Sequence, residues 1–94
     1  MSCCLEFHPK ALKEWASLNK SEKEQFAKKL KQRLDHPRVE KDKLSGHANV
    51  YKIKLRSIGY RLAYEVIAER LVVYVVAVGK RENNKVYNEL MSRI

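Results

Sequence analysis

The chain has 94 residues, of which 45% are hydrophobic and 33% charged, a composition typical of one folded domain spanning residues 1–94 and not of a disordered segment. Lysine and arginine outnumber aspartate and glutamate by 20 to 11, so the formal net charge is +9 and polyanionic partners are favoured. The longest apolar run, residues 71–79, is far shorter than the roughly 20 residues that cross a bilayer, and the N-terminus lacks the pattern of a signal peptide. We therefore expect a cytoplasmic protein without a membrane anchor.

The beginning of the chain predicts a short strand and a helix. Residues 3–7 alternate between two sets of side chains, as a strand requires. Pro9 suits the first turn of a helix, and Asn19 marks the expected end of that helix. The apolar stripe predicted for this helix consists of Leu12, Trp15, Ala16 and Leu18.

A second helix is predicted directly afterwards, so that the two helices form a hairpin. Ser21 and Glu24 have the spacing of a capping box at its start, and Pro37 ends it. Its predicted apolar face consists of Phe26, Leu30 and Leu34.

Lysines fill the outer faces of the predicted hairpin. They form either a solvated surface or, together with Arg33 and Arg38, a surface that grips a phosphate backbone. The lysines concerned are Lys10, Lys13, Lys20, Lys23, Lys28, Lys29 and Lys31.

The second half predicts three strands and a terminal helix. Residues 50–56, 60–67 and 71–78 are rich in β-branched and aromatic side chains, with short turns between them, and predict an antiparallel meander. The third run is apolar on both faces, so we place it centrally in the sheet. Residues 83–94 predict a helix that packs through Val86, Leu90 and Met91. The expected class is α+β, with the order β-α-α-β-β-β-α and a mostly antiparallel four-stranded sheet.

Cations line one face of the strand predicted at 50–56. Lys52, Lys54 and Arg56 alternate with apolar residues, and Arg61 joins them from the next strand. Side chains two apart on one face are roughly 6.5–7 Å from each other, so the like charges repel and need a reason to be there. A phosphate-bearing ligand supplies that reason, and a solvated sheet face is the alternative.

The stretch "GKRENNKVY" at 79–87 adds Lys80, Arg81 and Tyr87 next to the central strand. Neither paired carboxylates nor a histidine pair accompanies them, and the two adjacent cysteines and three histidines lack the spacing of metal ligands. We therefore expect no metal or cofactor. The remaining chemistry is that of phosphate, carried out by cations and a phenol.

Three blocks in this order resemble the RelE family of bacterial toxins, the mRNA-cleaving partners in toxin–antitoxin pairs: "ALKEW" at 11–15, "YKIKLRSIGYRLAYEV" at 51–66 and "VGKRENNKVY" at 78–87. The resemblance implies the same fold and cleavage of mRNA in the ribosomal A site through attack by a 2′-hydroxyl. The catalytic set that it implies is Lys52, Lys54, Arg61, Arg81 and Tyr87. Ser45 departs from close relatives, which often place a basic residue at this position.

The resemblance also implies roles for these residues. Lys54 or Tyr87 takes the proton of the attacking hydroxyl, and we prefer Tyr87, whose phenolate the nearby cations favour. Arg61 suits binding of the phosphate, and Arg81 assists the leaving group. Because a guanidinium is nearly always protonated, literal proton donation by Arg81 is hard, and charge stabilisation is an equally good description. Further RNA contacts are expected from Arg56, Lys80, Lys10 and Lys13.

The implied partners are a RelB-like antitoxin and the 70S ribosome with its mRNA and rRNA; neither a membrane nor a metal is expected. The toxin-binding segment of the antitoxin should be acidic and amphipathic, because this chain carries +9. It would dock across the hairpin and sheet or displace the C-terminal helix.

Two alternatives stay open at this point. The first is a module that binds RNA or the ribosome without cutting, or a degenerate toxin. The second is a toxin of the same fold that acts on another target, as the ParE relatives do on gyrase. Those relatives lack the catalytic set named above, which argues against this alternative.

Overall fold

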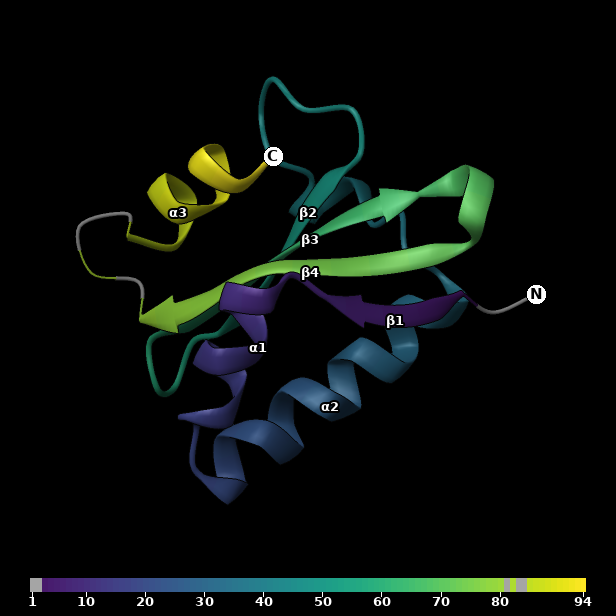
Figure 1. The fold of residues 1–94 in the computed structure, drawn as a ribbon. Coiled ribbons are helices and arrows are strands. Elements are labelled where there is room, and N and C mark those ends of the chain that lie inside the picture. Colours follow the sequence, from purple (N-terminus) through teal and green to yellow (C-terminus); the bar gives the residue numbers. More distant parts are fainter. Residues whose placement is uncertain (1–2, 81, 83–84) are drawn as a thin grey trace.

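The computed structural model describes residues 3–80, 82 and 85–94, in which a four-stranded sheet lies between a helical hairpin and a third helix (Figure 1). The elements in chain order are β1 (Cys4–Phe7), α1 (Pro9–Ala16), α2 (Lys20–Asp35), β2 (Val50–Leu55), β3 (Tyr60–Ile67), β4 (Val72–Lys80) and α3 (Lys85–Arg93), with short 3₁₀ turns at Glu40–Asp42 and Ala68–Arg70. The predicted order of elements is confirmed.

The sheet has the strand order β1-β4-β3-β2. Strands β2, β3 and β4 form the predicted antiparallel meander, whereas β1 pairs parallel to β4. Strand β4 lies between β1 and β3, and most of its side chains are buried on both faces of the sheet. This explains why its sequence is apolar at successive positions. The mostly antiparallel sheet and the central position of the third run are therefore confirmed.

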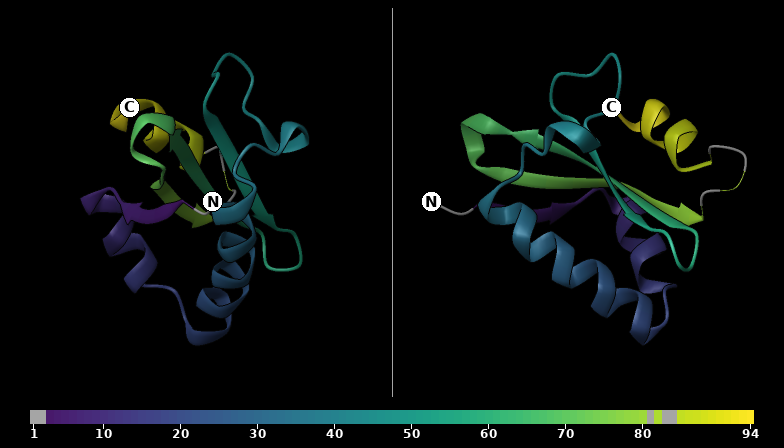
Figure 2. Two further views of the ribbon diagram at one scale, coloured as in Figure 1. Left: turned by 90° about the vertical axis from the view of Figure 1, so that its right-hand side faces the viewer. Right: turned by 180° about the vertical axis from the view of Figure 1, so that it is seen from behind.

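The larger core lies between the sheet and the hairpin, with α1 and α2 on the same side (Figure 2). Phe26 and Leu30 of α2 are almost fully buried there, as their helical spacing predicts. The alternation in β2 sends Tyr51, Ile53 and Leu55 into this core, and its intervening residues therefore face the opposite side.

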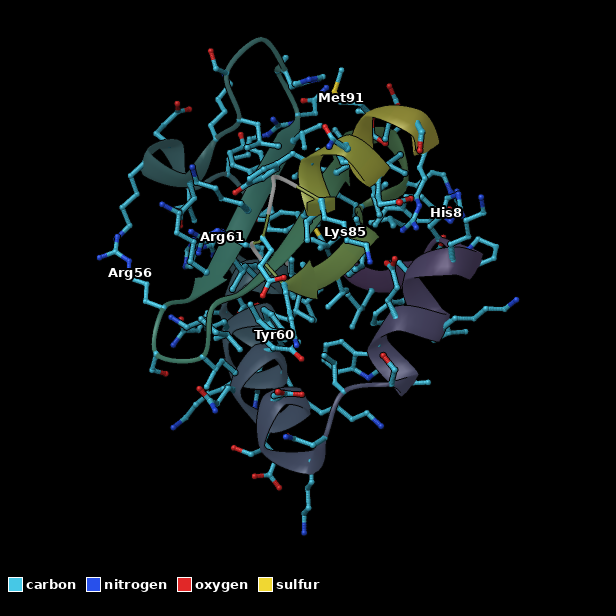
Figure 3. The ribbon with its side chains drawn as sticks, turned by 90° about the vertical axis from the view of Figure 1, so that its left-hand side faces the viewer. His8, Arg56, Tyr60, Arg61, Lys85 and Met91 are labelled. Atoms are coloured by element: carbon cyan, nitrogen blue, oxygen red, sulfur yellow. The ribbon has the colours of Figure 1, made fainter. Side chains whose placement is uncertain are left out.

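The smaller core lies on the other face of the sheet, under α3. Val86 and Leu90, four residues apart on one side of α3, pack on Ala63, Val76 and Ala77. The prediction that these two α3 residues face the body is confirmed. The same prediction for the next residue is wrong: Met91 is 57% exposed and projects away from the sheet, because it lies about 100° around the helix from Leu90 (Figure 3).

A shift of register in the β3–β4 pair changes which residues of β4 face α3. It falls between Ala63 and Tyr64, so that Val76 of β4 has no partner on β3. Val75 and Val78 consequently belong to the hairpin-side core, while Val76 and Ala77 both lie under α3. The alternation that resumes after the shift directs position 79 to α3 and position 80 to the hairpin side.

The apolar face of α1 differs from the prediction. Ala11 is fully buried, and Leu12, predicted to be in the stripe, is 53% exposed. Ala16 is also exposed. The helix begins at Pro9, and from that start it is Ala11, Trp15 and Leu18 that share the buried side, at intervals of four and three residues.

The cap of α2 also differs from the prediction. The capping box is formed by Asn19 and Glu22, each of whose side chains accepts a backbone N–H of the other, at 2.8 and 2.9 Å. Ser21 and Glu24, predicted for this role, lie inside the helix, at its second and fifth residues. Asparagine is as good an N-cap as serine, so Asn19 begins the second helix instead of ending the first. Among the described helices, none is long and apolar enough to span a membrane.

Candidate active site

One row across the sheet brings together two of the predicted catalytic cations. Lys54 of β2 is the direct register partner of Arg61 of β3, and Arg61 is in turn the partner of Gly79 of β4. Neighbouring strands lie about 4.8 Å apart, so these three positions fit within roughly 10 Å. All three face the side of the sheet on which α3 lies.

Gly79 is the point where α3 meets this row. A Cβ atom at position 79 would lie 3.3 Å from Cγ2 of Val86, so the absence of a side chain lets the helix approach closely. Tyr87 follows Val86 directly and is half-buried. The first turn of α3, which carries Tyr87, is thus held close to the strand that pairs with Arg61.

Lys52 lies two residues before Lys54 in β2, so both side chains are on the same face of the sheet, and Lys52 is paired with Ala63. Its positive charge is the main reason that the pKa of Lys54 is lowered from its ordinary value. Loss of hydration and the charges of Arg61 and Arg56 act in the same direction, and Asp42 opposes them. A lowered pKa increases the neutral fraction of the Lys54 amine, which is the form that accepts a proton.

Arg61 lies on the sheet face in Figure 3 and is half-buried. Its Nη1 atom is buried and has no hydrogen-bond partner within the described part of the chain. A guanidinium whose donors point to no partner is suited to a planar anion such as phosphate. The position of Arg61 thus agrees with the phosphate-binding role that the sequence suggests.

Arg56 lies beyond the end of β2, is exposed and projects outward (Figure 3). It lines a groove of about 610 Å³ between α2 and β2, to which Lys54, Lys29 and Lys41 also contribute. The groove therefore connects the row to a second cationic surface at the edge of the sheet.

Arg33 and Arg38, considered as phosphate-gripping residues, instead hold the fold together. Arg33 contacts Asp42 at 2.6 Å and donates to the hydroxyl of Tyr64 at 2.9 Å and to the carbonyl of Lys52 at 3.3 Å. Arg38 donates to Asn49 Oδ1 at 2.9 Å. Because the Arg33 side chain is only 12% exposed and its donors are engaged, a contact with external phosphate is disfavoured.

Three of the predicted RNA-binding lysines lie away from the row. Lys10 and Lys13 are exposed on α1, on the hairpin side of the sheet. Lys80 is exposed at the end of β4 and alternates with Gly79, so it faces the hairpin side as well. Arg81, predicted to assist the leaving group, lies outside the described residues.

Sequence reasoning did not single out Gly79, which allows α3 to approach the row. Its signal was a glycine inside an otherwise β-branched strand, a pattern that marks the close approach of another backbone. In the described ranges no three histidine, cysteine, aspartate or glutamate side chains gather into a group that holds a metal.

Known proteins with similar sequences match this chain over most or all of its length. The model of the family described as "ParE toxin of type II toxin-antitoxin system, parDE" matches residues 5–85. The mRNA interferase toxin RelE of Escherichia coli K12 is 52% identical over 94 residues, covering 100% of this chain and 99% of the relative. The mRNA interferase RelE of Shigella flexneri matches to the same extent.

Solved structures agree with the described fold. A double arginine-to-alanine mutant of E. coli RelE in the free state superimposes with a TM-score of 0.93 at 51% identity, covering 100% of this chain and 99% of that one. The toxin in the intact E. coli RelBE toxin–antitoxin complex matches with a TM-score of 0.84 at 51% identity, over 87% of this chain and 100% of that one. Since the family model, the curated relatives and the structures coincide over nearly every residue, the chain belongs to the RelE family of toxins of type II toxin–antitoxin systems.

Proposed function

We propose that this protein is an mRNA interferase, a ribosome-dependent endoribonuclease that cleaves mRNA in the ribosomal A site and so inhibits translation. The observation that carries the proposal is the row in which Lys54 and Arg61 are register partners on one face of the sheet, with Lys52 on the same face and α3 close against Gly79 at the end of the row. Relatives named mRNA interferase are 52% identical over the full chain, which supports the same activity here.

The proposed reaction is attack by a 2′-hydroxyl on the adjacent phosphodiester. The O–P bond to the 2′-oxygen forms as the P–O5′ bond breaks, which leaves a 2′,3′-cyclic phosphate and a 5′-hydroxyl. The hydroxyl proton must leave, the 5′-oxygen must gain a proton, and negative charge on the phosphorane must be stabilised. Lys52 and Arg61 supply the positive charge at the phosphate.

Proton removal is assigned to Lys54. The lowered pKa of its amine supports this choice, whereas sequence reasoning alone preferred Tyr87. Tyr87 then serves to place the substrate, because it lies in the turn of α3 that approaches Gly79, and an aromatic ring stacks readily on a base. Arg81 remains the residue proposed to stabilise the leaving group.

The partners proposed are a RelB-like antitoxin and the 70S ribosome with its mRNA and rRNA, all in the cytoplasm. Complexes of E. coli RelE with the RelB antitoxin support the antitoxin partner. The net charge of +9 favours both an acidic antitoxin segment and rRNA. We also propose that the antitoxin displaces α3. This helix is held to the sheet by two buried apolar residues, Val86 and Leu90, and by the contacts of its C-terminal end.

The proposal is tested by toeprinting of programmed ribosomes with the wild-type chain and with Lys54→Ala, Arg61→Ala and Arg81→Ala. Wild type should produce new 5′ ends at the A-site codon, and each variant should lower the cleavage rate roughly 10²–10³-fold. Arg56→Ala is the matched control, because it removes a neighbouring charge outside the row. Ribosome binding without any cleavage by wild type would favour a binding module, and full cleavage by all three variants would contradict this site.

A further inference from the structure

The C-terminal end of α3 is held by a buried arginine. Arg93 has a side chain only 5% exposed and forms a two-pronged pair with Glu14 of α1, each prong at 2.9 Å. It also donates to the carbonyl of Val76 on β4 at 2.8 Å and to Glu89 on its own helix at 3.1 Å. One guanidinium therefore connects α3 to both the sheet and the hairpin.

This ion pair lies at an edge of β4 that no strand in the described part of the chain covers. Strand β1 pairs with β4 only as far as Val75, so the next backbone groups on that side of β4 need other partners. The carbonyl of Val76 accepts from Arg93, and the N–H of Val78 donates to Glu14 Oε1 at 3.1 Å. The pair is thus fixed to the backbone of the strand that also carries Gly79.

The apolar contacts of α3 lie close together on a short helix. Val86 and Leu90 lie one turn apart on a helix of nine residues, so they fix which side is buried but give only a short line of contact along the axis. A planar guanidinium bound at two oxygens and one carbonyl fixes direction as well as distance. Arg93, three residues after Leu90, adds a third attachment on the same side of the helix.

We propose that Arg93 is a positioning residue for cleavage: by pairing with Glu14 and Val76, it sets the orientation of α3 and so the place of Tyr87 relative to Lys54 and Arg61. The role rests on the function proposed above. Tyr87 is six residues from Arg93, about 9 Å along the helix axis, and a small rotation about the apolar contacts displaces its ring. Misplacement of a substrate-positioning group by about 1 Å can cost roughly 100-fold in rate.

The test measures single-turnover cleavage on programmed ribosomes by Arg93→Lys and Arg93→Gln, each in the wild-type and in the Tyr87→Ala background. Arg93→Gln should lower the rate constant about 10- to 100-fold, with the half-saturating toxin concentration nearly unchanged. Arg93→Lys should lose less, because it keeps the charge but not the two-pronged geometry. In the Tyr87→Ala background either substitution should change the rate by less than about twofold, because the group being positioned is already gone.

Arg70→Gln is the matched control, because it breaks an arginine–glutamate pair with Glu6 that is exposed and distant from α3. It should leave cleavage unchanged. Hydrogen exchange should be faster in α3 of both Arg93 variants and unchanged in β3, which separates loosening of the helix from unfolding. Should Arg93→Gln fail to fold, Arg93→Lys carries the same comparison.

Equal losses in the two backgrounds, or no loss at all, would overturn the positioning role. Lys54→Ala is measured alongside. Full cleavage by Lys54→Ala would overturn the proposed function and this role with it. Loss in Lys54→Ala together with full activity in Arg93→Gln would overturn the positioning role alone.

Discussion

Lys54 and Arg61 face each other directly across β2 and β3, with Lys52 one step along the strand on the same face. Positive charges at this separation repel, and Lys52 is the main cause of the lowered pKa of Lys54. The cluster is therefore suited to an anion and makes one of its own amines a better proton acceptor. The pH dependence of cleavage follows from this arrangement.

Lys52→Ala should move the pH dependence of cleavage to higher pH. Removing the main cause of the depression raises the pKa of Lys54, so a higher pH is needed to reach the same fraction of neutral amine. Single-turnover rates on programmed ribosomes should then fall most at neutral pH and recover partly as pH rises. Arg56→Ala, which removes a smaller cause, should shift the profile less. A uniform loss at every pH would show that Lys52 only binds phosphate.

Gly79→Ala should impair cleavage more than it impairs stability. The new Cβ would lie 3.3 Å from Val86, so α3 must move outward by a few tenths of an ångström and carry Tyr87 with it. We expect roughly a tenfold slower cleavage. Gly46→Ala is the control: its φ of +81° makes alanine strained by about 1 kcal/mol, but no atom lies near the new Cβ. Gly79→Ala should lower the cleavage rate more than Gly46→Ala does, whereas Gly46→Ala should lower the urea midpoint more.

Tyr64→Phe should destabilise the fold without altering the chemistry. The Tyr64 hydroxyl donates to the carbonyl of Pro37 at 2.6 Å and accepts from Arg33 at 2.9 Å. Loss of these buried hydrogen bonds should lower the free energy of unfolding by about 1–2 kcal/mol in urea titrations. Cleavage by the folded fraction should stay at the wild-type rate. Tyr74→Phe, which removes a hydroxyl outside this network, should change stability less.

Glu14 should make the protein sensitive to acid. Burial alone would raise the pKa of Glu14, but hydrogen bonds from Arg93 and the Val78 N–H, with the charges of Arg93 and Lys85, lower it overall. A lowered folded-state pKa gives stability that is complete above the unfolded pKa of about 4.3 and is lost as pH falls below it. Urea midpoints should therefore decline more steeply below about pH 4.3 in wild type than in Glu14→Gln. Glu6→Gln, in an exposed pair, should follow wild type.

The sequence predicts the elements and the two sides of the sheet because their periodicity is strong. Alternation in residues 50–56 gives the buried side of β2 and the cationic side correctly, and the apolar run after residue 71 gives the central strand. The start of α2 was misplaced by two residues, because Asn19 and Ser21 each stand three residues before a glutamate and local spacing does not distinguish them.

Other features depend on contacts that are remote in the sequence. The register shift opposite Val76 decides which side of the sheet Gly79 and Lys80 face, and alternation counted along β4 does not reveal it. The pairing of Glu14 with Arg93 joins residues 79 positions apart. The engagement of Arg33 with Tyr64 likewise appears only when α2 is packed on the sheet. These contacts decide which arginines hold the fold.

The edge of β4 beyond Val75 has a consequence for the behaviour of the protein at high concentration. An uncovered strand edge is a template on which another chain can add a strand, which leads to self-association. Here Arg93 and Glu14 occupy the Val76 carbonyl and the Val78 N–H, so an approaching strand finds these two ladder positions already taken. The ion pair thus acts as a gatekeeper against edge-to-edge aggregation, and its loss would open β4 to a second copy of the chain.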